Sequence, residues 1–491
     1  MNKHWFIPFT ILIASVCPSN ADLLPENKQS RHFQAMHQHL DLGGVLYGYV
    51  EIDGDMEKLA EMGQEIFDAI RKINPRDFPL EVNFQRVLQA TGLNGIKAIG
   101  ASSYKDGEVY RNKVFLLAPG EKRGLLRIAG GKPHAFETWS FAPAGADVVF
   151  EQDLNAKAIY DVIMEVAQIV MDDEGPAVIE GTLMQPLPEL GFKPMKIIND
   201  LDLKVSVVVD MQENRLLTIP DSPGNGIKMP LTDAVVKIDK MGWLIDHLAP
   251  LAAPEDGLRV FRDLQWEGIE LTEEAPGDFK VYRPVLMKHL RTGSLVLATR
   301  QVFAQRCFSE KPTLAEDPKF KQAIEGLPRK GNGFAYVSTT LHETVNDVFE
   351  QIPPGEMGGM ENVVQKLVSF VIPGKNGPEA SVSVNLPEGF LTVANSGSSL
   401  KSDLASAIAV PMLNVGPLLL FSIRAPFSDD RVLDVPDFIE ADEAIFLENN
   451  AEAIEIPIDE EDDPIEDIDQ LLRELELPPP PVPDQKGNKG D

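Results

Sequence analysis

The sequence repeats one short unit, in which a run of β-forming residues is followed by a polar turn and an amphipathic helix. The first copy is a strand over 45–50 and a helix over 55–73, in which apolar residues recur every three or four positions. Three further copies begin later in the chain, at Asp147, Val235 and Phe334. Asp153 and Thr340 are of the residue types that cap helix N-termini, so we expect them to begin the helices of two later copies. Units of this kind bury their apolar faces when their helices cover a sheet.

Segments of period-two alternation lie between these units and predict antiparallel hairpins. One hairpin joins 96–103 to 109–117 through a Lys-Asp-Gly turn, and another joins 380–386 to 390–394 through Pro-Glu-Gly. Hairpins mixed with strand–helix units are typical of an α+β fold. We therefore expect mixed, mainly antiparallel sheets covered by helices.

The length of the chain predicts more than one module. At 491 residues it exceeds the size at which a single hydrophobic core stops growing. From the repeated units we expect three α+β modules, over 44–140, 141–328 and 329–428. A polar segment over 22–43 precedes them.

The N-terminus, over 1–21, has the order of a secretory signal peptide. A short positive start precedes an apolar run that ends at Val16, and Ser19 and Ala21 occupy the small-residue positions of a cleavage site. We therefore expect a mature chain that begins after Ala21 and is periplasmic or secreted. Lipidation of Cys17 is the alternative, although the branched Val16 before it fits a lipobox poorly.

The C-terminal segment over 429–491 differs in composition from the rest of the chain. It carries 22 acidic and four basic residues, and therefore 18 of the 31 net negative charges. This density of like charge, with few aromatic residues and a polyproline run over 478–483, predicts a disordered tail. Four apolar residues of the tail have helical spacing and are the candidate partner-docking residues: Ile468, Leu471, Leu472 and Leu475.

The acidic balance argues against two classes of partner. Nucleic-acid binding needs a basic face that displaces counterions from phosphates, and anionic membranes attract basic segments. Neither partner is expected for a chain of net charge −31.

A second apolar run, over 404–423, is interrupted by Pro411, Asn414 and Pro417. These residues favour a helix end, a turn and a buried strand rather than a membrane span. We therefore expect no transmembrane segment after signal cleavage.

Three clustered histidines, His32, His37 and His39, are the candidate metal ligands. No two of them have the three- or four-residue separation that brings side chains together on one face of a helix. No cysteine or pair of carboxylates lies near them in sequence. The acidic run over 459–463 lacks the ligand register of an EF-hand. We therefore expect a solvated N-terminal segment and no metal or other cofactor.

Signatures of nucleophilic catalysis are weak. A Ser-x-x-Lys pattern occurs twice, at Ser102 and Ser398, without the Lys-Thr-Gly that should follow it. There is no P-loop, Gly-x-Ser-x-Gly or His-Glu-x-x-His motif. Cys307 lies among apolar residues, so we expect it to be a buried core cysteine. A hydrolase would need a histidine beside a carboxylate or a serine in a cleft, and the histidines to inspect are His134, His247, His289 and His342.

One stretch of the chain resembles a known family. The segments that carry the resemblance are 294–299, 313–318, 327–328 and 334–337, with a further one over 143–149. Their order is similar to that of a group of exported bacterial proteins that share a domain of unknown function. The resemblance is loose over 44–428 and best over 290–350. It implies an exported protein of repeated strand–helix modules and supplies no activity and no catalytic residue. Many members carry a membrane anchor, whereas this chain has only a predicted cleavable signal.

From these observations we expect an exported, non-enzymatic envelope protein that acts by protein–protein interaction, with another envelope protein as its partner. The alternative is a periplasmic carrier that holds a lipid or another apolar ligand between sheet and helices. An undetected hydrolase is the third hypothesis.

Overall fold

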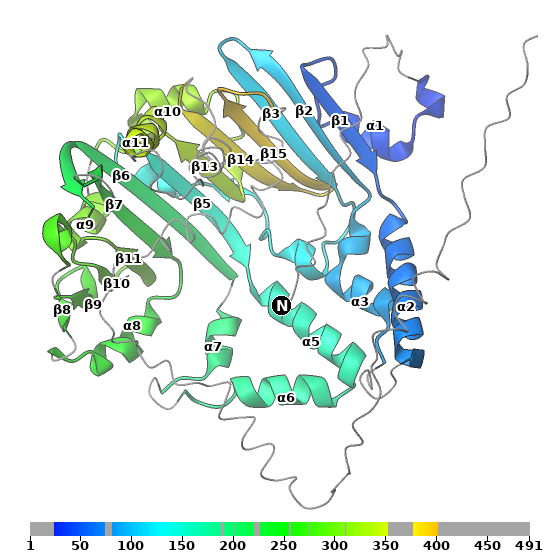
Figure 1. Ribbon diagram of the computed structural model, residues 1–491, viewed down its shortest axis with the longest axis horizontal. Helices are drawn as coiled ribbons and strands as arrows, with labels where there is room; N and C mark the ends of the chain where they lie inside the picture. The colour runs from blue at the N-terminus through cyan, green and yellow to red at the C-terminus, as the bar shows by residue number, and fades with distance from the viewer. Residues whose placement is uncertain are drawn as a thin grey trace, which may run out of the picture. The chain divides into compact units, whose positions relative to one another are not determined.

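The computed structural model describes residues 24–400, apart from 74–80, 188–190, 201, 220–225, 255–256, 274, 310 and 352–376. These residues form the expected α+β fold, built on a 13-stranded antiparallel sheet (Figure 1). The predicted signal peptide over 1–21, the apolar run over 404–423 and the acidic tail over 429–491 lie outside the described residues.

The strands of the sheet do not follow one another in chain order. From one edge to the other they are β1 (Leu46–Glu51), β2 (Ala98–Asp106), β3 (Val109–Leu117), β15 (Gly389–Ser396), β14 (Glu379–Leu386), β13 (Gly333–Val337), β5 (Val148–Asn155), β6 (Asp202–Thr218), β7 (Lys228–Ile238), β11 (Ser294–Ala298), β10 (Val285–His289), β9 (Trp266–Leu271) and β8 (Leu258–Arg262). A second sheet pairs β4 (His134–Ala135) with β12 (Lys330–Gly331). All three predicted modules therefore supply strands to one sheet, and their boundaries remain predictions.

Both predicted hairpins are confirmed. β2 pairs with β3 from Asp106 opposite Val109 to Ala98 opposite Leu117. β14 pairs with β15 in the same way around the Pro-Glu turn. Because a one-residue slip would turn every side chain to the other face, the apolar alternation sets this register.

The helices described in the structure are α1 (Arg31–His37), α2 (Asp55–Ile73), α3 (Phe84–Thr91), α4 (Thr138–Phe141), α5 (Lys157–Met171), α6 (Glu174–Leu183), α7 (Pro194–Asn199), α8 (Trp243–Leu248), α9 (Gln301–Ser309), α10 (Pro318–Ala323) and α11 (Thr339–Glu350). The predicted helix over 55–73 matches α2. Helices α2, α3, α5 and α6 lie in a row, each against the next, beyond the ends of the central strands (Figure 1). Within the described part of the chain, no helix is long and apolar enough to span a membrane.

The main core lies on one face of the sheet. Val149, Val208 and Val235 occupy directly opposed positions on β5, β6 and β7, and all three are fully buried. Helices α9 and α10 cover them with Phe303 and Phe320, in the same apolar cluster. Full burial of each such side chain contributes about 1.5–3 kcal/mol. Cys307 of α9 belongs to this cluster, which confirms the predicted core cysteine.

Two predicted helix caps are wrong. Asp153 lies inside β5, and α5 begins only at Lys157 without a side-chain cap. The strand continues because the Asp153 carboxylate accepts hydrogen bonds from His134, a partner that the local sequence does not reveal. Thr340 is the second residue of α11, which begins at Thr339.

We expected the polar segment over 22–43 to be solvated, but part of it packs against the sheet. It contains α1, which Ser30 caps by accepting a hydrogen bond from the backbone of Phe33. His32 of this helix is buried, with Nδ1 2.9 Å from Oε1 of Glu51 on β1. Hydrogen bonds from Tyr49 and then from Ser30 lower the pKa of the Glu51 carboxyl to about 2. The N-terminal segment is therefore part of the folded body, because its polar groups find partners on β1.

Candidate functional site

The strongest candidate for chemistry among the four histidines is His134, which pairs with Asp153. Its Nε2 lies 2.8 Å and 3.0 Å from the two carboxylate oxygens of Asp153, and its Nδ1 lies 2.9 Å from the carbonyl oxygen of Ala135. A carboxylate and a carbonyl can only accept hydrogen bonds. Both ring nitrogens therefore donate, which is the pattern of an imidazolium ion.

Two asparagines extend this pair into a network. Asn332 donates from Nδ2 to Asp153 and to the carbonyl oxygen of Gly131, each at 3.0 Å. The Nδ2 of Asn385 donates to the carbonyls of residues 129, 130 and 131, and its backbone N–H donates to Asn332. The network therefore ties the 129–131 loop to β5, to β14 and to Asn332, which lies between β12 and β13.

The electrostatics of His134 favour a structural role over a catalytic one. Burial opposes its protonation, but the Ala135 carbonyl and the Asp153 carboxylate outweigh burial and raise the pKa of His134 above the ordinary 6.5. Lys204 is the nearby cation that opposes protonation. A general base must accept a proton at a free nitrogen, and in this arrangement neither nitrogen is free. The His134 cluster acts as a clamp on the loop.

We expect His134→Gln to weaken the protein more at low pH than at high pH. Because the folded-state pKa is raised, the pair contributes its full stability below the unfolded value and loses it as the pH rises through the folded value. The free energy of unfolding of the variant should be about 1 kcal/mol below that of the unaltered protein at about pH 5.5. This difference should be smaller at about pH 8.5. Urea unfolding of the two proteins at both pH values measures this difference in the free energy of unfolding. Asp153→Asn should show the same trend, and a pH-independent loss in both variants would contradict the clamp.

The other three histidines face different surroundings. His247 packs against the rings of Phe192 and Trp243. His289 is buried, with Nδ1 2.9 Å from the hydroxyl of Thr292, and burial lowers its pKa. Burial also lowers the pKa of His342, whose Nε2 has no hydrogen-bond partner among the described residues. Of the four, the structure brings only His134 into direct hydrogen bonding with a carboxylate within the described ranges.

The candidate metal ligands do not converge. His32 contacts Glu51, His37 stacks on Phe33, and His39 lies with its ring centroid 4.3 Å from that of Phe115. In the part of the chain that the structure describes, no group of three or more His, Cys, Asp or Glu side chains is arranged to hold a metal ion.

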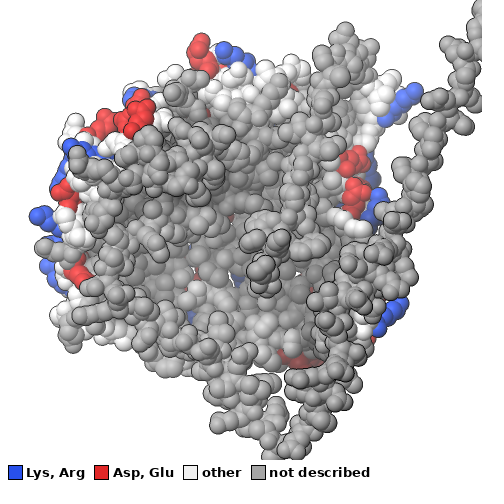
Figure 2. Space-filling view, in the orientation of Figure 1, with Lys and Arg blue, Asp and Glu red and all other residues white. Residues whose placement is uncertain are grey.

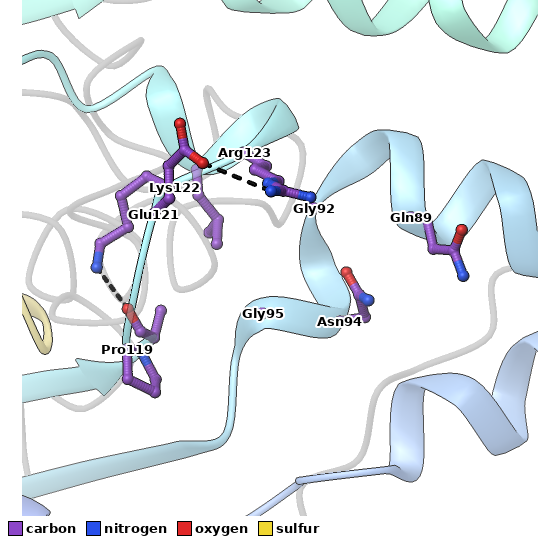
Figure 3. Close-up of a pocket in the computed structure, with 10 residues that line it drawn as sticks. Gln89, Gly92, Asn94, Gly95, Pro119, Glu121, Lys122 and Arg123 are labelled. Carbon is purple, nitrogen blue, oxygen red and sulfur yellow. Dashed lines mark hydrogen bonds and ion pairs between the residues drawn. The ribbon is translucent and has the colours of Figure 1, made fainter.

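A polar cleft lies where the end of α3 meets the loop before a short 3₁₀ helix, η3 (Gly124–Arg127) (Figure 3). Its volume is about 320 Å³. Gln89 and Asn94 border it from the α3 side, and Glu121 and Arg123 face them from the loop, 3.5 Å apart from each other. A second cleft of about 310 Å³ shares Gln89 and is lined by Arg86, Glu165, Gln168 and Ile169.

Lys122 is the most constrained cation of the first cleft. Its ammonium donates to the carbonyl oxygens of Ala118, Gly120 and Pro387 and lies 5.5 Å from the ring centroid of Phe390. Burial lowers the pKa of Lys122. Its three donors are committed to the fold, so Lys122 braces the loop.

The lining of both clefts bears on the carrier hypothesis. An acyl chain needs an enclosed apolar cavity, because only apolar contacts stabilise it out of water. Amide and charged side chains border the two clefts instead. They suit a small hydrogen-bonding ligand, and they give the carrier hypothesis no support.

A stripe of half-exposed apolar side chains runs along α2. Five large apolar side chains, spaced by three and four residues, are between 41% and 59% exposed: Leu59, Met62, Ile66, Ile70 and Ile73. One flank of this stripe faces α3, where Phe67 packs on Phe84 with ring centroids 5.7 Å apart. The sequence predicted one apolar stripe and did not reveal that most of it faces outward.

Charged side chains of the described residues form no patch of one sign on the face shown in Figure 2. On the face shown in Figure 2, the visible acidic and basic side chains of the described residues are interspersed. This mixture offers no broad field of one sign for an oppositely charged partner.

Comparison of the chain with models of known protein families, with curated proteins and with solved structures finds no match.

Proposed function

We propose that the protein is an exported, non-enzymatic interaction protein, and that it binds its partner through the outward stripe of α2. Export rests on the signal-peptide pattern over 1–21. The interaction role rests on one observation, the five half-exposed apolar side chains of α2.

The energetics of the stripe support this proposal. Full burial of one Leu, Ile or Met side chain contributes about 1.5–3 kcal/mol, and single exposed apolar residues are common on any surface. Five in a row along one helix form a continuous apolar strip, which is typical of a protein interaction site. The commitment of both His134 nitrogens supports a non-enzymatic role. The predicted docking residues over 468–475 remain a second hypothetical contact.

Site-specific photo-crosslinking in the host envelope tests the proposal. A photoreactive residue at Met62 should give a defined adduct, whereas one at Leu264, which is 98% exposed, should give none. The adduct from Met62 should disappear when Leu59 and Ile66 are replaced with glutamate, because charge in the stripe opposes its burial.

The matched control carries glutamate at Leu264 and Val302, which are 98% and 72% exposed and lie outside α2. It should retain the Met62 adduct. Circular dichroism establishes that both double variants are folded. Equal adducts from Met62 and Leu264, or an adduct that survives the Leu59→Glu and Ile66→Glu changes, would contradict the proposed interface.

A further inference from the structure

The outward face of α2 follows the heptad pattern of a coiled coil. Leu59, Met62, Ile66, Ala69 and Ile73 alternate at spacings of three and four, and all are exposed. This is the a/d repeat of 3.5 residues that keeps one seam turned toward a partner helix. A lipid surface or a flat protein surface requires no such repeat.

Charged residues lie along one side of this seam at intervals of one heptad. Lys58, Glu65 and Lys72 occupy the g positions, and all three are exposed. The e positions lie on the side nearer α3, where a Cβ on Gly63 would stand 3.3 Å from the ring of Phe84. The g row is therefore the open row, and charges at such positions select the partner helix.

A second copy of α2 is a poor match for this row. In the antiparallel register that aligns the whole seam, the g rows face each other, so Lys58 would face Lys72 and Glu65 would face Glu65 of the other copy. In a parallel pair g faces e, so Lys58 would face Gly63 and Glu65 would face Ile70. The first arrangement opposes like charges, and the second gives the charges no partner.

We infer that α2 binds an amphipathic helix of a different protein, whose facing row carries an acidic, a basic and an acidic residue at heptad spacing. This inference rests on the proposed function and names the chemistry of the partner. The order acid–base–acid reads the same in both chain directions, so it complements Lys58, Glu65 and Lys72 in either orientation of the partner helix. Lys58 also pairs with Asp55 at 2.9 Å, so its contribution to selection is smaller than that of Lys72.

Two synthetic three-heptad peptides test the inference. They share Leu and Ile at the seam and differ only in the flanking row, which reads Glu-Lys-Glu in one and Lys-Glu-Lys in the other. Fluorescence anisotropy measures their binding to the full mature chain. The Glu-Lys-Glu peptide should bind at least about tenfold more tightly, because three exposed pairs change from repulsive to attractive.

The triple variant Lys58→Glu, Glu65→Lys, Lys72→Glu should reverse this preference and leave the seam intact. Equal affinity of the two peptides, an unreversed preference, or unchanged binding to the Leu59→Glu, Ile66→Glu variant would overturn the inference. Self-association of the chain through α2 in sedimentation would also overturn it. If the Met62 adduct persists while neither peptide discriminates, the helix inference fails and the proposed interface stands. If Met62 and Leu264 give equal adducts, both the helix inference and the proposed interface fail.

Discussion

Replacing Arg300 with methionine is expected to lower the free energy of unfolding by about 4 kcal/mol. Its guanidinium holds the carboxylate of Asp233, which is fully buried on β7, through two hydrogen bonds, of which Nε to Oδ1 is 2.7 Å. Asp210 of β6 lies directly opposite Asp233 in the sheet. The substitution would leave a buried carboxylate facing another acid without its cation, and a buried unpaired charge is strongly destabilising.

An exposed ion pair supplies the matched control. Lys288 pairs with Asp246 at 2.9 Å, but the Asp246 side chain is half exposed, so Lys288→Met should change stability by less than about 1 kcal/mol. Adding Asp233→Asn to Arg300→Met should recover much of the loss, because it removes the stranded charge. Urea unfolding of the four proteins measures these differences. Equal losses for Arg300→Met and Lys288→Met would show that the buried pair contributes no more than a surface pair.

The second large effect is expected beside the polar cleft, where Gly124→Ala should lower the free energy of unfolding by about 3 kcal/mol. Gly124 has a φ of +52°, and a Cβ there would stand 2.3 Å from the backbone carbon of Thr91. The left-handed backbone contributes about 1 kcal/mol, and the forced separation of two packed backbones contributes about 2 kcal/mol more. The loop and the end of α3 must move apart, so the cleft should widen as well.

Gly120→Ala separates the two causes. Gly120 lies in the same loop with a φ of +86°, but nothing stands within 4 Å of its added Cβ. It should therefore show only the backbone strain, about 1 kcal/mol. Thermal or urea unfolding of both variants measures the difference. If the two alanine substitutions lower the free energy of unfolding equally, the close approach to Thr91 does not constrain the loop.

The spacing of apolar residues and the positions of turn residues were enough to predict much of the fold. The helix over 55–73 and both hairpins follow from periodicity and turn residues, because these depend on neighbours in the chain. Asp153 shows the limit of this reasoning. It has the side chain of a helix cap, yet its partners are His134 and the far more distant Asn332, which extend the strand instead.

The candidate site was harder to predict than the fold for the same reason. The sequence named His134 among the histidines to inspect, but its geometry with Asp153 depends on β4 meeting the end of β5. Periodicity also predicted an apolar stripe on α2. Whether that stripe faces the core or the solvent depends on where α3 packs, and no local signal carries that information.

The order of the strands determines when this sheet can be completed during synthesis. β3 ends at Leu117 and β5 begins at Val148, yet β15, β14 and β13 stand between them. The facing side of β5 is an open edge until Val337 of β13 has been made, and the facing side of β3 is an open edge until Ser396 of β15 has been made. Until β13 and β15 have been made, these two open edges can pair wrongly with each other or with another chain, and deletion of β13 and β15 would leave both edges exposed.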